Sequence, residues 1–200
     1  DEFTKKVADK TRALPNVKIR LMDKGEIRRE AGIIKDIYNE AWRNNWNFTP
    51  FTDMELEVIA NEYKMFIDER IAYVAEVDGK AAAMLFAIPD INELIADFNG
   101  ELMKNPINLV KLLWRLKFNR PKRARLIMLG VHHDYRASRK YGALAAVLYE
   151  EISVRGKAAG YIGGELSWTL EDNDLVNRPI ELFGCTRTKR YRIYGKQLQD

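Results

Sequence analysis

The chain has little of several residue types, and each scarcity excludes a class of protein. Its single cysteine, Cys185, rules out an internal disulfide and a cysteine-rich metal site. Its two histidines, His132 and His133, are adjacent and belong to no metal-binding motif, so no metal is expected. No apolar run approaches the length of a membrane span and no signal peptide is visible, which favours a cytoplasmic protein.

What is present describes a globular protein with a substantial core. The 200 residues are 46% hydrophobic and 31% charged, which suits one domain. The net charge of +4 suits an anionic ligand, but it is too small to indicate nucleic acid without a dedicated motif, and none is found. The chain begins at Asp1 rather than Met, as a fragment or a processed form would.

The stretch Leu126–Ile152 carries the strongest local pattern. It begins as an apolar strand to Val131, passes through a basic loop to Gly142, and continues as a helix with apolar residues on one face. Unpaired N–H groups and the dipole at a helix start favour an anion, and a glycine lets a ligand approach the main chain. The stretch therefore predicts either a phosphate site or an ordinary strand–loop–helix unit with a solvated basic loop.

Periodicity, capping and turn signals predict the other elements. Thr52 and Glu55 have the spacing of a capping box, and Asp78-Gly79 is a hairpin signal. The expected order is a frayed helix or linker over 1–15, strand Val17–Leu21, helix Glu26–Trp42, a helix from Thr52 to Ile67, strands Arg70–Val77 and Lys80–Ile88, helices Ile91–Asn99 and Ile107–Phe118, strand Leu126–Val131, a helix ending at Gly160, strand Tyr161–Thr169, a short helix ending near Phe183, and strand Thr188–Tyr194.

Two motifs resemble those of the GCN5-related N-acetyltransferase (GNAT) superfamily. Val131, Tyr135-Arg136 and Arg139-Lys-Tyr-Gly142 resemble its acyl-CoA-binding motif, and Asn173 precedes Gly184 by eleven residues, as in many members. The chain departs from the family in a longer loop after the strand, Leu144 at the second small position and Cys185 in place of Phe. The resemblance covers roughly residues 17–196. The combined motifs resemble those of a bacterial branch of the superfamily.

The resemblance implies an α/β (α+β) fold with one GNAT-like domain over residues 16–200. A central mixed, mostly antiparallel twisted sheet would be flanked by helices. A helical insertion at about residues 90–122 would precede the cofactor-binding strand.

The same resemblance implies an acyl-CoA-dependent N-acyltransferase, most simply an N-acetyltransferase. A small-molecule amine would attack the thioester of acetyl-CoA, or of another acyl-CoA, directly. The alternative is a non-catalytic GNAT-like domain that binds CoA or serves as a scaffold within a larger protein. The residues implied in cofactor binding are Leu129, Val131, Arg136, Arg139, Lys140, Tyr141, Gly142, Ala143 and Asn173.

Catalytic roles are also implied by position. Glu165, on the strand after the cofactor-binding helix, is the expected general base, or alternatively a structural partner of an arginine. The family's usual acid is a tyrosine, but Ile180 stands at that position here, so Tyr191 is the expected substitute. Asn173 equally suits a helix N-cap.

Two further segments suggest partners. The aromatic residues of the first helix and its loop predict an apolar acceptor pocket, or else a cover for the core. The segment Leu109–Arg125 combines leucines with basic residues, as does an amphipathic helix on a membrane surface, a helix packed on the domain, or a basic rim for CoA phosphates. A homodimer is compatible with the family. The expected acceptor-binding residues are Tyr38, Trp42, Trp46, Phe48 and Phe51.

Overall fold

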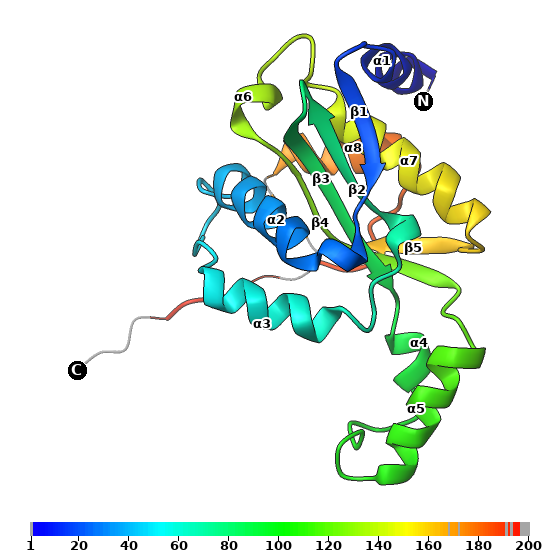
Figure 1. Ribbon diagram of the computed structural model, residues 1–200. Coiled ribbons are helices and arrows are strands. Elements are labelled where there is room, and N and C mark those ends of the chain that lie inside the picture. Colours follow the sequence, from blue (N-terminus) through cyan, green and yellow to red (C-terminus); the bar gives the residue numbers. More distant parts are fainter. Residues whose placement is uncertain (1, 168, 172, 191, 193, 197–200) are drawn as a thin grey trace.

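The fold is built on a five-stranded sheet with the order β1-β2-β3-β4-β5 (Figure 1). The computed structural model describes residues 2–167, 169–171, 173–190, 192 and 194–196. Neighbouring strands are antiparallel from β1 to β4, and β5 is parallel to β4, which confirms the expected mixed, mostly antiparallel sheet. The strands are β1 (Val17–Leu21), β2 (Ala72–Val77), β3 (Lys80–Pro89), β4 (Arg123–Val131) and β5 (Gly163–Leu166).

The hairpin between β2 and β3 forms where the sequence predicts it. Asp78 and Gly79 both have positive φ, 51° and 76°, as a two-residue type I′ turn requires. Aspartate and glycine tolerate this left-handed conformation better than other residues. The two strands that the turn joins supply much of the buried core.

A β-bulge interrupts β4 halfway along its length. The pairing steps from Met128 to Leu126 while β3 advances by one residue, so Ile127 is the extra residue. Ile127 and Met128 consequently both pack on the side of α2 (Ile27–Ala41), whereas Leu126 and Leu129 pack on the side of α7 (Leu144–Ala158).

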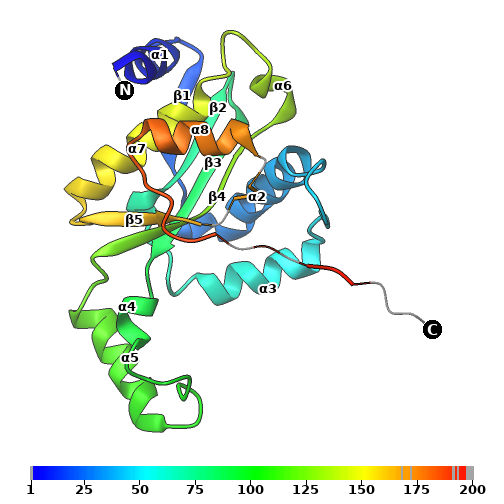
Figure 2. The same ribbon diagram turned by 180° about the vertical axis from the view of Figure 1, so that it is seen from behind.

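Helices cover both faces of the sheet. On one face lie α2 and α3 (Asp53–Tyr63), and on the other lie α7 and α8 (Asp174–Leu182), as the front and back views show (Figures 1 and 2). The predicted capping box begins α3, with Thr52 and Glu55 bonded reciprocally. The short helices η1 (Lys24–Glu26), η2 (Glu69–Ile71) and α6 (His133–Arg136) lie in connections.

The N-terminal residues, expected as a frayed helix or a linker, form α1 (Glu2–Arg12), which packs against α7. Ala8 is fully buried there. The Arg12 guanidinium lies 2.8 Å from Glu150 and 3.2 Å from Glu151 on α7. These contacts attach the helix although its sequence shows no full apolar face.

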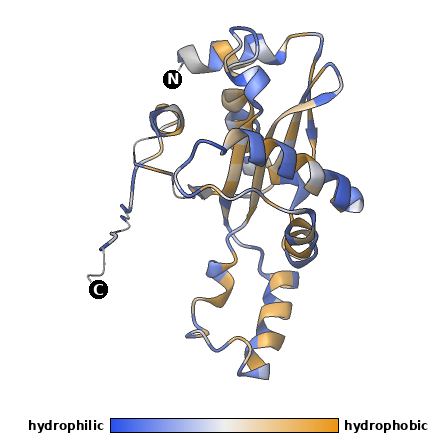
Figure 3. Cartoon of the chain, turned by 90° about the vertical axis from the view of Figure 1, so that its left-hand side faces the viewer, coloured by the Kyte–Doolittle hydropathy of each residue, from blue (hydrophilic) through white to orange (hydrophobic). Residues whose placement is uncertain are grey.

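A helical insertion projects from the end of the sheet between β3 and β4 (Figures 1 and 3). It contains α4 (Asn92–Ile95) and α5 (Pro106–Phe118). Leu94, Phe98 and Leu112 form a small core of its own. At its base, the Asp90 N–H donates to the Arg123 carbonyl over 2.8 Å.

The predicted last strand, Thr188–Tyr194, is wrong for the residues that the structure describes there, which form no strand. Arg190 and Arg192 instead pair with the half-exposed Glu171, at 3.2 and 3.1 Å. Basic residues at nearly every other position hold this segment in solvent rather than against a sheet edge. Tyr191 lies outside the described residues.

Candidate active site

The site is organised by the divergence of β4 and β5. The two strands pair only from Arg123 to Leu126 on β4, and the Ser167 N–H makes a further bond to the Leu126 carbonyl over 3.1 Å. Beyond this point β4 continues to Val131, while the chain after Ser167 leads towards α8 (Figure 2). The distal half of β4 therefore has no paired neighbour on the β5 side among the described residues.

The open edge presents backbone donors. The His132 N–H donates to the Ala82 carbonyl of β3 over 2.8 Å, so residue 132 points its polar groups towards β3. Strand alternation then directs the N–H groups of Leu129 and Val131 away from β3, into the gap. The backbone N–H groups of these two predicted residues are thus available at the open edge of β4.

The loop from β4 to α7 is a tight turn closed by Ser138. Its carbonyl accepts from the Gly142 N–H over 2.8 Å, and its hydroxyl accepts from the N–H groups of Lys140 and Tyr141 over 3.2 and 3.4 Å. A Cβ at Gly142 would lie only 2.8 Å from the Ser138 carbonyl oxygen and 3.3 Å from that of Arg136. Glycine is therefore required here by close backbone approach.

The basic side chains of this loop are solvent-exposed. Arg136, Arg139 and Lys140 all face water, which leaves them accessible to an anion. Tyr141 differs, because its hydroxyl accepts a 2.7 Å hydrogen bond from Asn16. This bond, with Lys140 beside the ring, lowers the pKa of Tyr141. Tyr141 thus anchors the loop to the start of β1. Ala143 occupies the N-cap position of α7 and makes no side-chain capping bond.

Glu165 does not lie at the gap. It is half-exposed, and its carboxylate lies 2.6 Å from the guanidinium of its cross-strand neighbour Arg125. Leu129 is four residues further along β4, roughly 13 Å at a strand rise of about 3.3 Å per residue. This is the arginine-paired arrangement rather than the buried one, and direct proton transfer from an amine at Leu129 would exceed hydrogen-bond distance.

At the start of α8, hydrogen bonds are made by Asn177 rather than by the predicted Asn173. Asn173 occupies the N-cap position but makes no side-chain capping bond. The buried Asn177 accepts from the Thr169 hydroxyl and donates to the carbonyls of Leu170 and Glu171, over 2.9 and 3.3 Å. Sequence reasoning missed Asn177, although it lies one turn after Asn173 and one turn before Ile180.

The predicted aromatic residues form a cluster beside β4. The Tyr38 ring lies 5.1 Å from Trp42, 5.6 Å from Phe48 and 4.5 Å from Phe51, measured between ring centroids. Burial raises the pKa of the Tyr38 phenol. Trp46 stands apart with 66% of its surface exposed. Four of the five expected acceptor residues are therefore assembled.

Gly130 seats this cluster against β4. A Cβ there would lie 2.6 Å from Cζ3 of Trp42 and 3.0 Å from Cγ2 of Ile37. Only a residue without a side chain lets the indole lie flat on the strand. Sequence reasoning missed the role of Gly130. A glycine inside a strand often indicates that another group approaches the backbone closely, as Trp42 does here.

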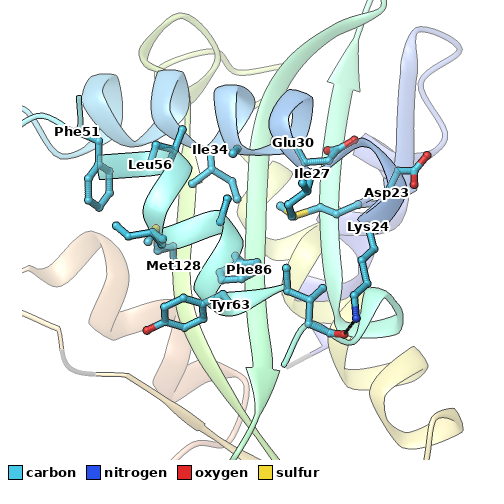
Figure 4. A pocket seen from close by; sticks show the side chains of 15 residues that line it. Asp23, Lys24, Ile27, Glu30, Ile34, Phe51, Leu56, Tyr63, Phe86 and Met128 are labelled. Carbon is cyan, nitrogen blue, oxygen red and sulfur yellow. Dashed lines mark hydrogen bonds between the residues drawn. The ribbon is translucent and has the colours of Figure 1, made fainter. Parts of the chain in front are cut away.

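An apolar cavity of about 50 Å³ lies next to the cluster, between α2, α3 and the sheet (Figure 4). At one end Lys24 donates to the Ile67 carbonyl over 3.4 Å. Met128, beside the bulge, connects the cavity wall to the open part of β4. Of the predicted acceptor residues, only Phe51 lines this cavity. The other principal lining side chains are Ile34, Leu56, Tyr63, Phe86 and Met128.

One buried charged group borders the cavity. Glu30 is 1% exposed, and its carboxylate pairs with Arg20 at 2.9 Å and with Arg29 at 2.7 Å. The Glu30 carboxylate therefore pairs with two arginines and is turned away from the apolar side chains of the cavity. Among the described residues, no three His, Cys, Asp or Glu side chains gather as a metal site would require.

The mixed, mostly antiparallel five-stranded sheet flanked by helices matches the GNAT fold. Solved structures agree: AAC(6')-Iy, an aminoglycoside N-acetyltransferase in complex with CoA, gives a TM-score of 0.54 at 15% identity, covering 91% of this chain and 95% of that one. Agmatine N-acetyltransferase gives 0.51 at 17% identity, covering 84% and 82%. A possible acetyltransferase from Clostridium difficile 630 gives 0.51 at 13%, covering 92% and 99%. The fold expected from the motifs is thereby confirmed.

Two curated bacterial proteins are more similar in sequence. Protein YghO of Escherichia coli (strain K12) is 36% identical over 194 residues, covering 97% of this chain and 49% of that protein. Bacterial ceramide synthase of Caulobacter vibrioides (strain NA1000 / CB15N) is 36% identical over 188 residues, covering 94% and 48%. This chain thus spans about half the length of the curated relatives it matches. No protein-family model matches the sequence.

Proposed function

We propose that this chain transfers an acyl group from an acyl-CoA thioester to an amine that carries a long hydrocarbon chain. The observation that carries the proposal is the open edge of β4 lying directly beside an apolar cavity. The name of the Caulobacter relative supports it, because a ceramide is the amide of a long-chain amino alcohol and a fatty acid.

The acyl donor would lie between the diverging strands. The N–H groups of Leu129 and Val131 would bind the thioester oxygen, where negative charge develops as the amine attacks. The loop closed by Gly142, with Arg139 exposed beside it, would bind the pyrophosphate. The Ser138 hydroxyl already accepts from two loop amides, and a phosphate oxygen can accept from the same donors.

The hydrocarbon chain of the acceptor would enter beneath α3. Leu56 is the only residue of α3 that is buried, so this helix is held by few core contacts and would shift outward. The cavity as it stands accommodates only a few methylene groups, and such a shift would extend it along its apolar lining. Met128 would bring the amine end to the open edge of β4.

Glu165 and Tyr191 remain our candidates for base and acid. Because Glu165 lies beside Arg125, roughly 13 Å along the strand from Leu129, a chain of water molecules would have to carry the proton between the amine and the carboxylate. A Glu165→Gln variant that retains full activity would remove Glu165 from the mechanism.

Calorimetric titration with acetyl-CoA, a long-chain acyl-CoA and free CoA tests the donor site. We expect binding that Gly142→Glu abolishes and Arg139→Ala weakens. Gly32→Ala is the matched control, because a Cβ there meets nothing within 4 Å. Failure of the wild-type chain to bind any of the three ligands contradicts the donor site.

A series of amines of increasing chain length tests the acceptor. Each added methylene that becomes buried should raise kcat/KM about fourfold, from ~0.8 kcal/mol of transfer free energy. Ala60→Phe fills the cavity from α3 and should abolish this gain, whereas Val58→Phe, on the exposed side of the same helix, should preserve it. A flat dependence on chain length contradicts the hydrocarbon site but leaves acyl transfer intact.

The non-catalytic alternative rests on one observation. Ile180, at the position of the family's usual acid, packs against the core and offers no proton. CoA binding without turnover of any amine in the series would favour a CoA-binding half of a longer protein.

A further inference from the structure

The helical insertion presents an apolar face that its own core does not use. Leu112 and Leu116 of α5 turn inward to the cluster with α4. On the outer side, a stripe of apolar residues at helical spacing is exposed. The cartoon in Figure 3 colours much of the projecting insertion as hydrophobic. The exposed fractions of its members are Ile107 64%, Val110 65%, Leu113 52%, Trp114 55% and Phe118 60%. We call these five residues the outer stripe.

The charged residues of the segment that contains the outer stripe all have one sign. No Asp or Glu occurs from Leu102 to Arg125, whereas the same segment contains eight lysines and arginines, of which Arg115 is paired with Asp97 and Arg125 with Glu165. Lys111 and Lys117 are exposed. At about 100° per residue, Lys111 borders the stripe and Lys117 lies within it, at the C-terminal end of α5. The Lys117 ammonium lies 5.4 Å from the ring of Phe118, so its charge remains at the level of the aromatic side chains.

The insertion holds α5 in place from the inside. Arg115 makes hydrogen bonds of 2.5 and 2.9 Å to the Asp97 carboxylate and one of 2.5 Å to the Leu94 carbonyl. The helix is therefore already formed and oriented before any partner binds. Its exposed stripe is available without unfolding.

We propose that the outer stripe docks on the surface of an anionic lipid bilayer. Aromatic and aliphatic side chains on one helix face would enter the headgroup region, and Lys111 and Lys117 would extend their ammonium groups to lipid phosphates. A protein surface would need to supply many acidic groups around an apolar centre, whereas an anionic bilayer supplies both features everywhere. None of the described helices could span a bilayer by itself. The proposal does not depend on the acyl-transfer chemistry.

Co-sedimentation of the chain with vesicles tests the docking. Vesicles of phosphatidylcholine with 30% phosphatidylglycerol should pellet the protein at low salt, and pure phosphatidylcholine vesicles should pellet much less. Val110→Ser combined with Trp114→Ser should lower partitioning at least tenfold. The matched control is Val58→Ser with Val154→Ser, two similarly exposed apolar residues on other helices. Lys111→Gln with Lys117→Gln should lower partitioning about 30-fold, at roughly fivefold per charge near the surface.

Tryptophan fluorescence locates the contact. Trp114 emission should shift to the blue and be quenched by brominated lipid, and Trp114→Phe should lose both signals while still pelleting. No pelleting of the wild type on anionic vesicles overturns the proposal. Equal loss in the Val58/Val154 control overturns it as well. A dimer in sedimentation velocity that Val110→Ser dissociates, without lipid binding, would assign the stripe to a second copy instead.

Discussion

Gly130 provides the most direct test of how the aromatic cluster is seated on β4. In a strand interior, Gly→Ala ordinarily stabilises a protein by ~0.5–1 kcal/mol, because alanine loses less backbone entropy on folding. At this position the new Cβ would lie 2.6 Å from Cζ3 of Trp42 and 3.0 Å from Cγ2 of Ile37. Carbon atoms prefer about 3.5–4.0 Å, so the indole must move by about 1 Å.

Overpacking of this kind costs ~1–3 kcal/mol, which exceeds the entropic gain. We therefore expect Gly130→Ala to lower the free energy of unfolding by about 1–2 kcal/mol, measured by urea denaturation. In a Trp42→Leu background most of this cost should vanish, giving a coupling free energy of ~1 kcal/mol or more. The contact with Ile37 remains in both backgrounds, so recovery should be incomplete.

Gly32→Ala on α2, where the added Cβ has open space, is the control and should be neutral or stabilising. Two results would refute the reasoning. One is a Gly130→Ala variant as stable as the wild type, and the other is an unchanged cost in the Trp42→Leu background.

Three further predictions concern polar contacts. Arg20→Met leaves the buried Glu30 carboxylate without its main partner and should cost about 3 kcal/mol in urea denaturation; a change below ~0.5 kcal/mol contradicts this. The Arg115 hydrogen bond lowers the pKa of Asp97 from 3.8 to about 2. The ionised carboxylate therefore stabilises the insertion above pH 3.8, and this stabilisation is lost as the pH falls towards 2. Asp97→Asn should remove that pH dependence of unfolding, measured by tryptophan fluorescence. Asn177→Leu removes the two hydrogen bonds that this buried amide donates to the Leu170 and Glu171 carbonyls and should cost ~1–3 kcal/mol, seen as a lower thermal midpoint; an unchanged midpoint would show that water replaces the amide.

The elements that sequence reasoning placed correctly depend on local chemistry. The hairpin at Asp78-Gly79 and the capping box from Thr52 to Glu55 are determined within four residues, so no distant contact is needed to predict them. The motif around Gly142 likewise indicated the loop and helix that follow β4.

The features that sequence reasoning missed depend on register between distant strands. The bulge at Ile127 exists only in the pairing with β3. An arginine partner for Glu165 was one of two expectations, but its identity as Arg125 follows from parallel alignment across forty residues. The cavity under α3 requires two helices and the sheet to meet. Periodicity predicts which residues are apolar, but it does not show where their packing leaves space.

The insertion begins and ends at the same place in the sheet. Pro89 and Ala124 are register partners on β3 and β4, and the bond from Asp90 to Arg123 closes the base. The chain leaves the sheet and returns to it at adjacent positions, as in an ordinary hairpin. A short turn in place of residues 91–122 would therefore preserve the sheet, and a foreign helical pair grafted there would be presented on the same rigid stem. The insertion is in this sense an exchangeable module, whose sequence can change independently of the residues that line the gap between β4 and β5.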